Sequence, residues 1–176
     1  MRGRVADLNP EVFRTVFNDN VMSAVSATIP SLEHIRQTGG SVVFVSSLAG
    51  IRGLPLLSSY SAAKMALRAL AETIRIEEAP YGIHVGLIYV GMTVNEEGKE
   101  AIAADGSKIP LQPRSGKGVL TMESVAKAVL QNIRKRKFIT VMTAMGRLNY
   151  LLQSLVPSLV EWIIIKNIRK FEENSK

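Results

Sequence analysis

Apolar residues along the chain follow two patterns, one typical of helices and one typical of buried strands. The first pattern begins after Asn9-Pro10, a pair suited to the N-cap and first position of a helix. Apolar positions three or four apart then predict a helix to about Pro30, and residues 31–37 are expected to add a turn or two before Gly39-Gly40. The unbroken run Ser41-Val42-Val43-Phe44-Val45 is typical of a strand buried on both faces.

The same alternation of helix and strand continues toward the C-terminus. Further helices are predicted over residues 60–78 and from an N-cap at Thr121 to about Lys135. Further strands are predicted over residues 83–89 and 138–142. Because helices alternate with short buried strands, the predicted fold class is α/β, with a partial Rossmann-like parallel sheet and flanking helices.

Two stretches fall outside this alternation. Residues 91–118 form a polar, glycine-containing segment that is longer than a routine connection, and we expect it to be a lid. The chain from Leu148 onward is predicted to be helical with a break near Pro157, apolar on one side and basic at its end. The expected organisation is therefore a sheet domain over 1–147 and an amphipathic, basic helical tail over 148–176.

The composition, with 47% hydrophobic and 21% charged residues among 176, is typical of a globular chain. It includes no cysteine and two isolated histidines, so thiolate chemistry and disulfides are excluded and no metal site is expected. His84 alternates with apolar residues and is expected to lie within the sheet, and His34 is expected at the surface. Any chemistry must come from hydroxyl, amide, carboxylate or amine groups.

The net charge of +7 is concentrated near the C-terminus. Residues 1–133 carry 13 Lys/Arg and 12 Asp/Glu, whereas residues 134–176 carry 9 and 3. Three interpretations of the basic run 134–137 and the basic tail stay open: a solvated helix end with a packing helix, an interfacial membrane helix, or a nucleic-acid patch. Aromatic residues are too few near the basic run to favour nucleic acid, so no nucleic-acid partner is expected.

Two negative observations bear on location. The opening residues lack the apolar run of a secretory signal, and polar residues interrupt the stretch 148–165 too often for an ordinary membrane-spanning helix. The expectation is a cytoplasmic protein, with peripheral membrane contact under the second interpretation of the tail.

Three side chains carry the candidate chemistry. Tyr60 and Lys64 are four residues apart on a predicted helix and so share one face, where the ammonium favours the phenolate form of the tyrosine. Ser47 follows the end of a buried strand, at the edge where parallel α/β sheets bind ligands. Two hydroxyls and an amine are expected to converge there, and a tuned tyrosine can act as a general acid or base.

These motifs resemble those of the classical short-chain dehydrogenase/reductase family. Val45-Ser46-Ser47-Leu48-Ala49-Gly50 is similar to its strand-end serine motif, and Tyr60-Ser61-Ala62-Ala63-Lys64 matches its catalytic Tyr-x3-Lys. Phe17-Asn18-Asp19-Asn20-Val21 resembles the helix segment with a fourth active-site residue, which maps to Asn20. Ile88-Tyr89-Val90-Gly91-Met92-Thr93 lies where the family has a Pro-Gly turn under the nicotinamide, with Val90 in place of the proline.

The resemblance implies a role for each of these residues. Tyr60 exchanges a proton with the oxygen of an alcohol or ketone substrate while hydride passes between the nicotinamide of NAD or NADP and the adjacent carbon. Ser47 holds that oxygen, Lys64 assists Tyr60 and binds the nicotinamide ribose, and Asn20 holds a water that links Lys64 to bulk solvent. Val90, Gly91 and Thr93 are expected to line the nicotinamide.

The resemblance also implies that part of the usual fold is missing. It begins at about Asp7, and no Gly-rich turn after a strand precedes that residue, so the N-terminal βαβ units that cradle the pyrophosphate are expected to be absent. The function expected is that of a truncated oxidoreductase in which only the nicotinamide half of the cofactor site is represented, with a small-molecule or lipid-like substrate. The alternative is a non-catalytic fragment or interaction module, because helices 10–29 and 60–78 are those that pair in homo-oligomers of the family.

Overall fold

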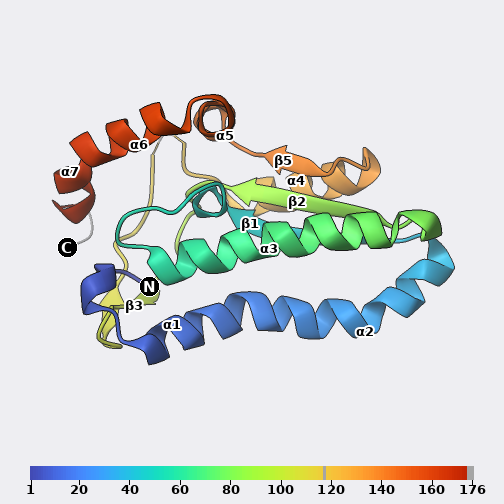
Figure 1. The fold of residues 1–176 in the computed structure, drawn as a ribbon, viewed down its shortest axis with the longest axis horizontal. Helices are drawn as coiled ribbons and strands as arrows, with labels where there is room; N and C mark the ends of the chain where they lie inside the picture. The colour runs from blue at the N-terminus through green and yellow to red at the C-terminus, as the bar shows by residue number, and fades with distance from the viewer. Residues whose placement is uncertain (117, 174–176) are drawn as a thin grey trace.

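The computed structural model describes residues 1–116 and 118–173. Its centre is a parallel sheet in the strand order β1-β2-β5 (Figure 1). The three strands are Ser41–Ser47 (β1), His84–Val90 (β2) and Ile139–Val141 (β5). The predicted α/β class with a parallel sheet and flanking helices is confirmed, and all three strands lie within two residues of their predicted positions.

Helices cover both faces of the sheet. Helix α3 (Ser58–Glu77) joins β1 to β2 and packs on one face, with α1 (Pro10–Phe17) and α2 (Ser23–Thr38) running beside it (Figure 1). Helix α4 (Met122–Arg134) joins β2 to β5 and covers the opposite face, where Asn132 lies against Gly86. The sheet is therefore enclosed between two helical layers.

The core is centred on β2, the middle strand. All seven of its residues are buried, and Leu87, Ile88 and Tyr89 have no exposed surface. His84 is also buried, with its ring nitrogens 3.0 Å from the Lys137 carbonyl and 3.3 Å from Ser41 Oγ, which confirms its expected place in the sheet. A strand without a polar face needs cover on both sides, and α3 and α4 provide it.

The first helical segment differs from the prediction in one place. Between α1 and α2 lies a five-residue π-helical turn, Asn18–Met22, in which Ser23 N–H donates to the Asn18 carbonyl. The helical turns predicted over residues 31–37 are confirmed: α2 continues through Pro30 to Thr38 and ends at Gly39, as expected. Pro30 lies on the exposed side of α2, where the carbonyl it leaves unpaired can reach water.

The segment 91–118 contains a small hairpin that the prediction of a lid did not include. Its strands are Glu100–Ile102 (β3) and Lys108–Pro110 (β4), paired antiparallel. Gly106, with φ +96°, allows the turn, and the Asp105 carboxylate accepts from Ser107 N–H at 2.9 Å. Arg2 N–H donates to the Ile102 carbonyl at 2.8 Å, so the hairpin is attached to the start of the chain.

Three helices follow β5: Ala144–Leu155 (α5), Pro157–Lys166 (α6) and Ile168–Glu173 (α7). The break near Pro157 agrees with the prediction. The tail helix begins four residues earlier than expected, because Thr143 Oγ1 accepts from Gly146 N–H at 3.0 Å and caps α5. The expected division between 147 and 148 thus falls inside α5, which packs on the sheet through the Tyr150 and Tyr89 rings, 5.9 Å apart.

Candidate active site

The ends of β1 and β2 meet at one edge of the sheet. In the parallel register Ser47 lies opposite Val90, the last residue of β2, so the two predicted site segments are neighbours. Ser47 Oγ accepts from Ala49 N–H at 3.3 Å and starts a 3-10 turn, Leu48–Gly50. The serine is thereby placed at the carboxyl ends of the strands, where ligands bind in open α/β sheets.

A close junction fixes this edge to α3. Ser46 Oγ donates to the Lys64 carbonyl at 3.0 Å. A Cβ at Gly50 would lie 2.4 Å from Ser46 Oγ and 2.8 Å from the Lys64 carbonyl oxygen, so only glycine permits this approach. Sequence reasoning assigned no role to Ser46 or Gly50. The alternation within β1, which turns Ser46 to the buried side, is a signal that could have identified Ser46.

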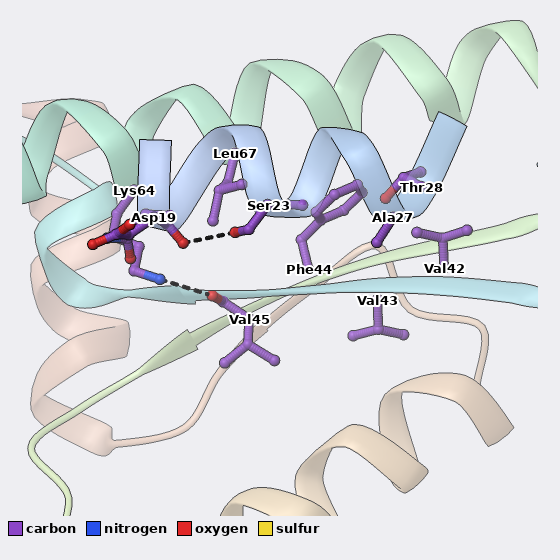
Figure 2. Close-up of a pocket in the computed structure, with 12 residues that line it drawn as sticks. Asp19, Ser23, Ala27, Thr28, Val42, Val43, Phe44, Val45, Lys64 and Leu67 are labelled. Carbon is purple, nitrogen blue, oxygen red and sulfur yellow. Dashed lines mark hydrogen bonds between the residues drawn. The ribbon is translucent and has the colours of Figure 1, made fainter. Parts of the chain in front are cut away.

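Tyr60 and Lys64 occupy one face of α3, as predicted. Lys64 Nζ lies 5.6 Å from the centroid of the Tyr60 ring. It also donates to the Val45 carbonyl at 3.4 Å, a bond drawn in Figure 2. Burial lowers the pKa of Lys64. The ammonium thus lies between the Tyr60 ring and the end of β1. From there its charge reaches the tyrosine, while one N–H group bonds to the strand.

Asn20 approaches the same region from the π-helical turn. Its Nδ2 donates to the Val16 carbonyl at 2.9 Å, a carbonyl four residues earlier in the chain. Asn20 and Lys64 line one cavity of about 360 Å³, which runs between α2 and β1 and also includes Asp19 and Val45 (Figure 2). π-helical turns are frequent at functional sites, because one inserted residue re-aims the side chains that follow.

The segment after β2 forms the far wall of the site. Val90 is buried, and a Cβ at Gly91 would lie 3.0 Å from Thr143 Cγ2. Thr93 forms a β-bridge with Leu120. Backbone hydrogen bonds hold the segment extended, from Leu120 N–H to the Met92 carbonyl at 2.8 Å and from Val94 N–H to the Leu120 carbonyl at 3.0 Å. The structure therefore places these residues toward β5 and α5, whereas Asn20 lies toward α2.

A parallel sheet with helices on both faces and connections through α3 and α4 is a fold of the Rossmann-like class. The chain belongs to the short-chain dehydrogenase family. The model of that family, described as "short chain dehydrogenase", matches residues 1–105.

Individual relatives agree with this assignment. Dehydrogenase/reductase SDR family member 7B of Xenopus laevis is 31% identical over 173 residues, which are 96% of this chain and 53% of the relative. The 3-ketodihydrosphingosine reductase of Bos taurus is 31% identical over 161 residues, covering 88% of this chain and 46% of the relative. The chain thus spans about half the length of these curated relatives.

Solved structures show the same fold. A short chain dehydrogenase from Burkholderia cenocepacia J2315, solved in complex with NADP, aligns with a TM-score of 0.74 at 18% identity. The alignment covers 89% of this chain and 60% of that protein. The sheet and helices described above are therefore a large part of the fold of that dehydrogenase.

Proposed function

We propose that the chain forms the catalytic part of an oxidoreductase that transfers a hydride between NAD or NADP and an alcohol or carbonyl substrate. The observation that carries the proposal is the position of Lys64, which lies between the Tyr60 ring and the carbonyl of Val45, two residues before Ser47. A hydroxyl donor, a phenol and a half-buried cation at one sheet edge are the groups that stabilise a developing alkoxide and move its proton.

The residues at the edge fit the nicotinamide and ribose of such a cofactor. Gly91 packs closely against Thr143, since a Cβ there would lie 3.0 Å from Thr143 Cγ2, and this contact fixes the backbone of the wall that Val90 and Thr93 flank. The Lys64 ammonium lines a cavity with polar groups and has three N–H donors, which suit ribose hydroxyls. We assign Tyr60 and Lys64 to the ribose and Val90, Gly91 and Thr93 to the ring. When bound, the nicotinamide supplies or accepts the hydride.

In the proposed reaction three side chains share the transfer of the proton, the positioning of the substrate oxygen and the stabilisation of the phenolate. Tyr60 Oη donates its proton to the oxygen of a carbonyl, or accepts one from an alcohol. Ser47 Oγ donates a hydrogen bond to the same oxygen and so holds it in position. Lys64 favours the phenolate that remains on Tyr60 after it donates.

Asn20 has a positioning role in this proposal. It lines the same cavity as Lys64 and its side chain is anchored by the Val16 carbonyl. From that place it holds a water next to Lys64, through which the site exchanges protons with solvent.

Two features of the relatives refine the substrate and cofactor. The bovine relative is named for the reduction of a keto-sphingoid, and the Burkholderia dehydrogenase was solved with NADP. We propose a ketone or secondary alcohol with a large apolar part as substrate, and NADP before NAD. A homo-oligomer paired through α1–α2 and α3 is the assembly we propose for the complete enzyme.

A second candidate function follows from the sheet edge. Among the described residues β1 pairs only with β2, so its other edge is open, and an open strand edge favours a module that binds a further strand without catalysis.

The test is turnover by matched tyrosine variants. Ketones and secondary alcohols of increasing chain length are assayed with NADP and NAD, following nicotinamide absorbance, for the native chain, Tyr60→Phe and Tyr81→Phe. Tyr81 is half exposed in the turn before β2, at the other end of the sheet, so its loss should leave turnover unchanged. Tyr60→Phe should lower kcat by about 10²–10⁴-fold. Equal turnover by both variants would refute the role of Tyr60, and absence of turnover in the native chain would overturn the proposal for this chain.

A further inference from the structure

Helices α5 and α6 expose large apolar side chains to an unusual extent. Six of them, each 44 to 69% exposed, are here called the elbow face: Leu148, Leu151, Leu155, Leu159, Trp162 and Ile163. On α5 they recur at three and four residues, and they continue onto α6 across the break at Val156. Only Val160 of α6 is buried. Apolar groups gathered in this way mark a surface that another phase or molecule covers.

The shape of the two helices limits what that cover can be. No single helix in the described part of the chain is long and apolar enough to cross a membrane, whereas α5 and α6 together have the required length and composition but are bent by 119°. At 1.5 Å per residue they are about 18 and 15 Å long, against about 30 Å of bilayer hydrocarbon. Each helix suits the plane of a membrane surface better than a path through it.

Basic side chains flank the elbow face. Residues 144–173 carry four of them, Arg147, Lys166, Arg169 and Lys170, against three acidic residues, Glu161, Glu172 and Glu173, of which Glu172 is paired with Arg4. Lys166 Nζ lies 3.9 Å from the centroid of the Trp162 ring. An indole beside a flexible cation is the combination that favours the boundary between lipid headgroups and acyl chains.

We propose that the elbow face docks on the interface of an anionic bilayer, with Trp162 at the headgroup boundary and the basic residues against acidic headgroups. An anionic lipid surface complements both the apolar side chains of the elbow face and the basic side chains that flank it.

Helix α5, which carries half of the elbow face, packs through other residues against the segment that follows Ser47. A Cβ at Gly146 of α5 would lie 2.7 Å from Leu48 Cδ2, and Leu48 follows Ser47 directly. Arg52 Nη1 donates to Gln153 Oε1 at 3.1 Å, which joins the loop after the 3-10 turn to α5. Docking of α5 would therefore hold the candidate site close to lipid, from which an apolar substrate could enter. Only this delivery of substrate rests on the proposed function.

The chain offers a direct probe, because Trp162 is its single tryptophan. Its emission is measured as phosphatidylcholine vesicles are added, with and without phosphatidylserine and with bromine-labelled acyl chains as quenchers. We expect a blue shift and quenching with anionic vesicles, and much weaker binding to neutral ones. A Trp162 emission spectrum that stays unchanged with every vesicle composition would overturn the proposal. A shift that depends on protein concentration without lipid would indicate self-association instead and would also overturn it.

Variants separate the apolar and charged contributions. Leu155→Ser/Leu159→Ser should weaken vesicle binding roughly tenfold or more, because two large apolar side chains no longer enter the interface. Ile29→Ser/Ile76→Ser is the matched control, since both residues are exposed on α2 and α3, away from α5 and α6. Arg169→Gln and Lys170→Gln should each weaken binding about fivefold at low salt and have little effect at high salt. These experiments need no turnover, so their failure is distinct from failure of the proposed reaction. Equal binding by the double variant and its control would refute the elbow face.

Discussion

Gly50 is the residue on which the junction of β1 and α3 depends, and replacing it by alanine is the sharpest test of how the site is held. The added methyl group would lie 2.4 Å from Ser46 Oγ and 2.8 Å from the Lys64 carbonyl oxygen, where about 3.4 Å is ordinary contact. A hydroxyl can rotate away, but the carbonyl belongs to the backbone of α3. Gly50→Ala must therefore move the turn after Ser47 away from α3 by roughly 0.6 Å.

The expected cost has two parts. Overpacking of a closely packed interior costs about 1–3 kcal/mol. The hydrogen bond from Ser46 Oγ to the Lys64 carbonyl, 3.0 Å long, is lost as the two segments separate, which costs about 1 kcal/mol more. We expect Gly50→Ala to lower the free energy of unfolding by about 2–4 kcal/mol, a large share of the 5–15 kcal/mol typical of a domain.

Urea unfolding measures this cost, and Gly53→Ala is the matched control. Gly53 lies three residues further along the same loop, and a Cβ there meets nothing within 4 Å. That variant should be neutral or slightly stabilising, because alanine restricts the unfolded chain. In Ser46→Ala/Gly50→Ala the contact with the hydroxyl is gone, so the double variant should cost less than the sum of the single ones. Equal midpoints for Gly50→Ala and Gly53→Ala would refute the close approach.

Three further outcomes are expected. Arg36 donates through two nitrogens to the buried Glu78 carboxylate and holds the pKa of that carboxyl below its usual value. The pair therefore stabilises the fold above about pH 4.5 and loses this effect as the pH falls below it. The difference in urea midpoint between the native chain and Arg36→Gln should shrink on acidification. Burial lowers the pKa of Lys64, so at neutral pH its charge opposes folding. Lys64→Met should therefore raise the urea midpoint at pH 7, and the difference from the native chain should fade as the pH approaches 10.5. Thr121 Oγ1 accepts from Ser124 N–H at 3.2 Å, and Thr121→Ala should lower the free energy of unfolding by about 1 kcal/mol, measured by thermal unfolding.

The strands and most helices could be predicted because their signals are local. Asn9 caps α1 through Glu11 N–H and Thr121 caps α4, as their sequence positions indicated. The three strands are short apolar runs between turn residues, and β2, read as 83–89, is displaced by one residue. The candidate site could be located for the same reason, since Ser47, Tyr60 and Lys64 take their places from a strand end and one helix face.

The parts that escaped prediction depend on contacts between distant segments or on small local signals. The buried residues Val12 and Val16 are four apart, but Val16 and Val21 are five apart, and this extra residue was the sequence signal of the π-helical turn. The Asp105-Gly106 pair was the signal of the hairpin in the expected lid. No local pattern reveals the approach of Gly50 to the Lys64 carbonyl, because it arises only when β1 and α3 pack together.

The open edge of β1 leads to a last prediction, on amide exchange. His84 N–H donates to the Gly40 carbonyl, and a parallel ladder repeats every second residue, so the backbone groups of Val42 and Phe44 face β2 whereas those of Val43 and Val45 face the edge. The bond from Lys64 Nζ to the Val45 carbonyl agrees with this alternation. Hydrogen exchange followed by NMR should find the amides of Val43 and Val45 fast and those of Val42 and Phe44 protected. Uniform protection along β1 would mean that a further strand, from a second copy in a pure sample, covers the edge and the cavity beside Lys64.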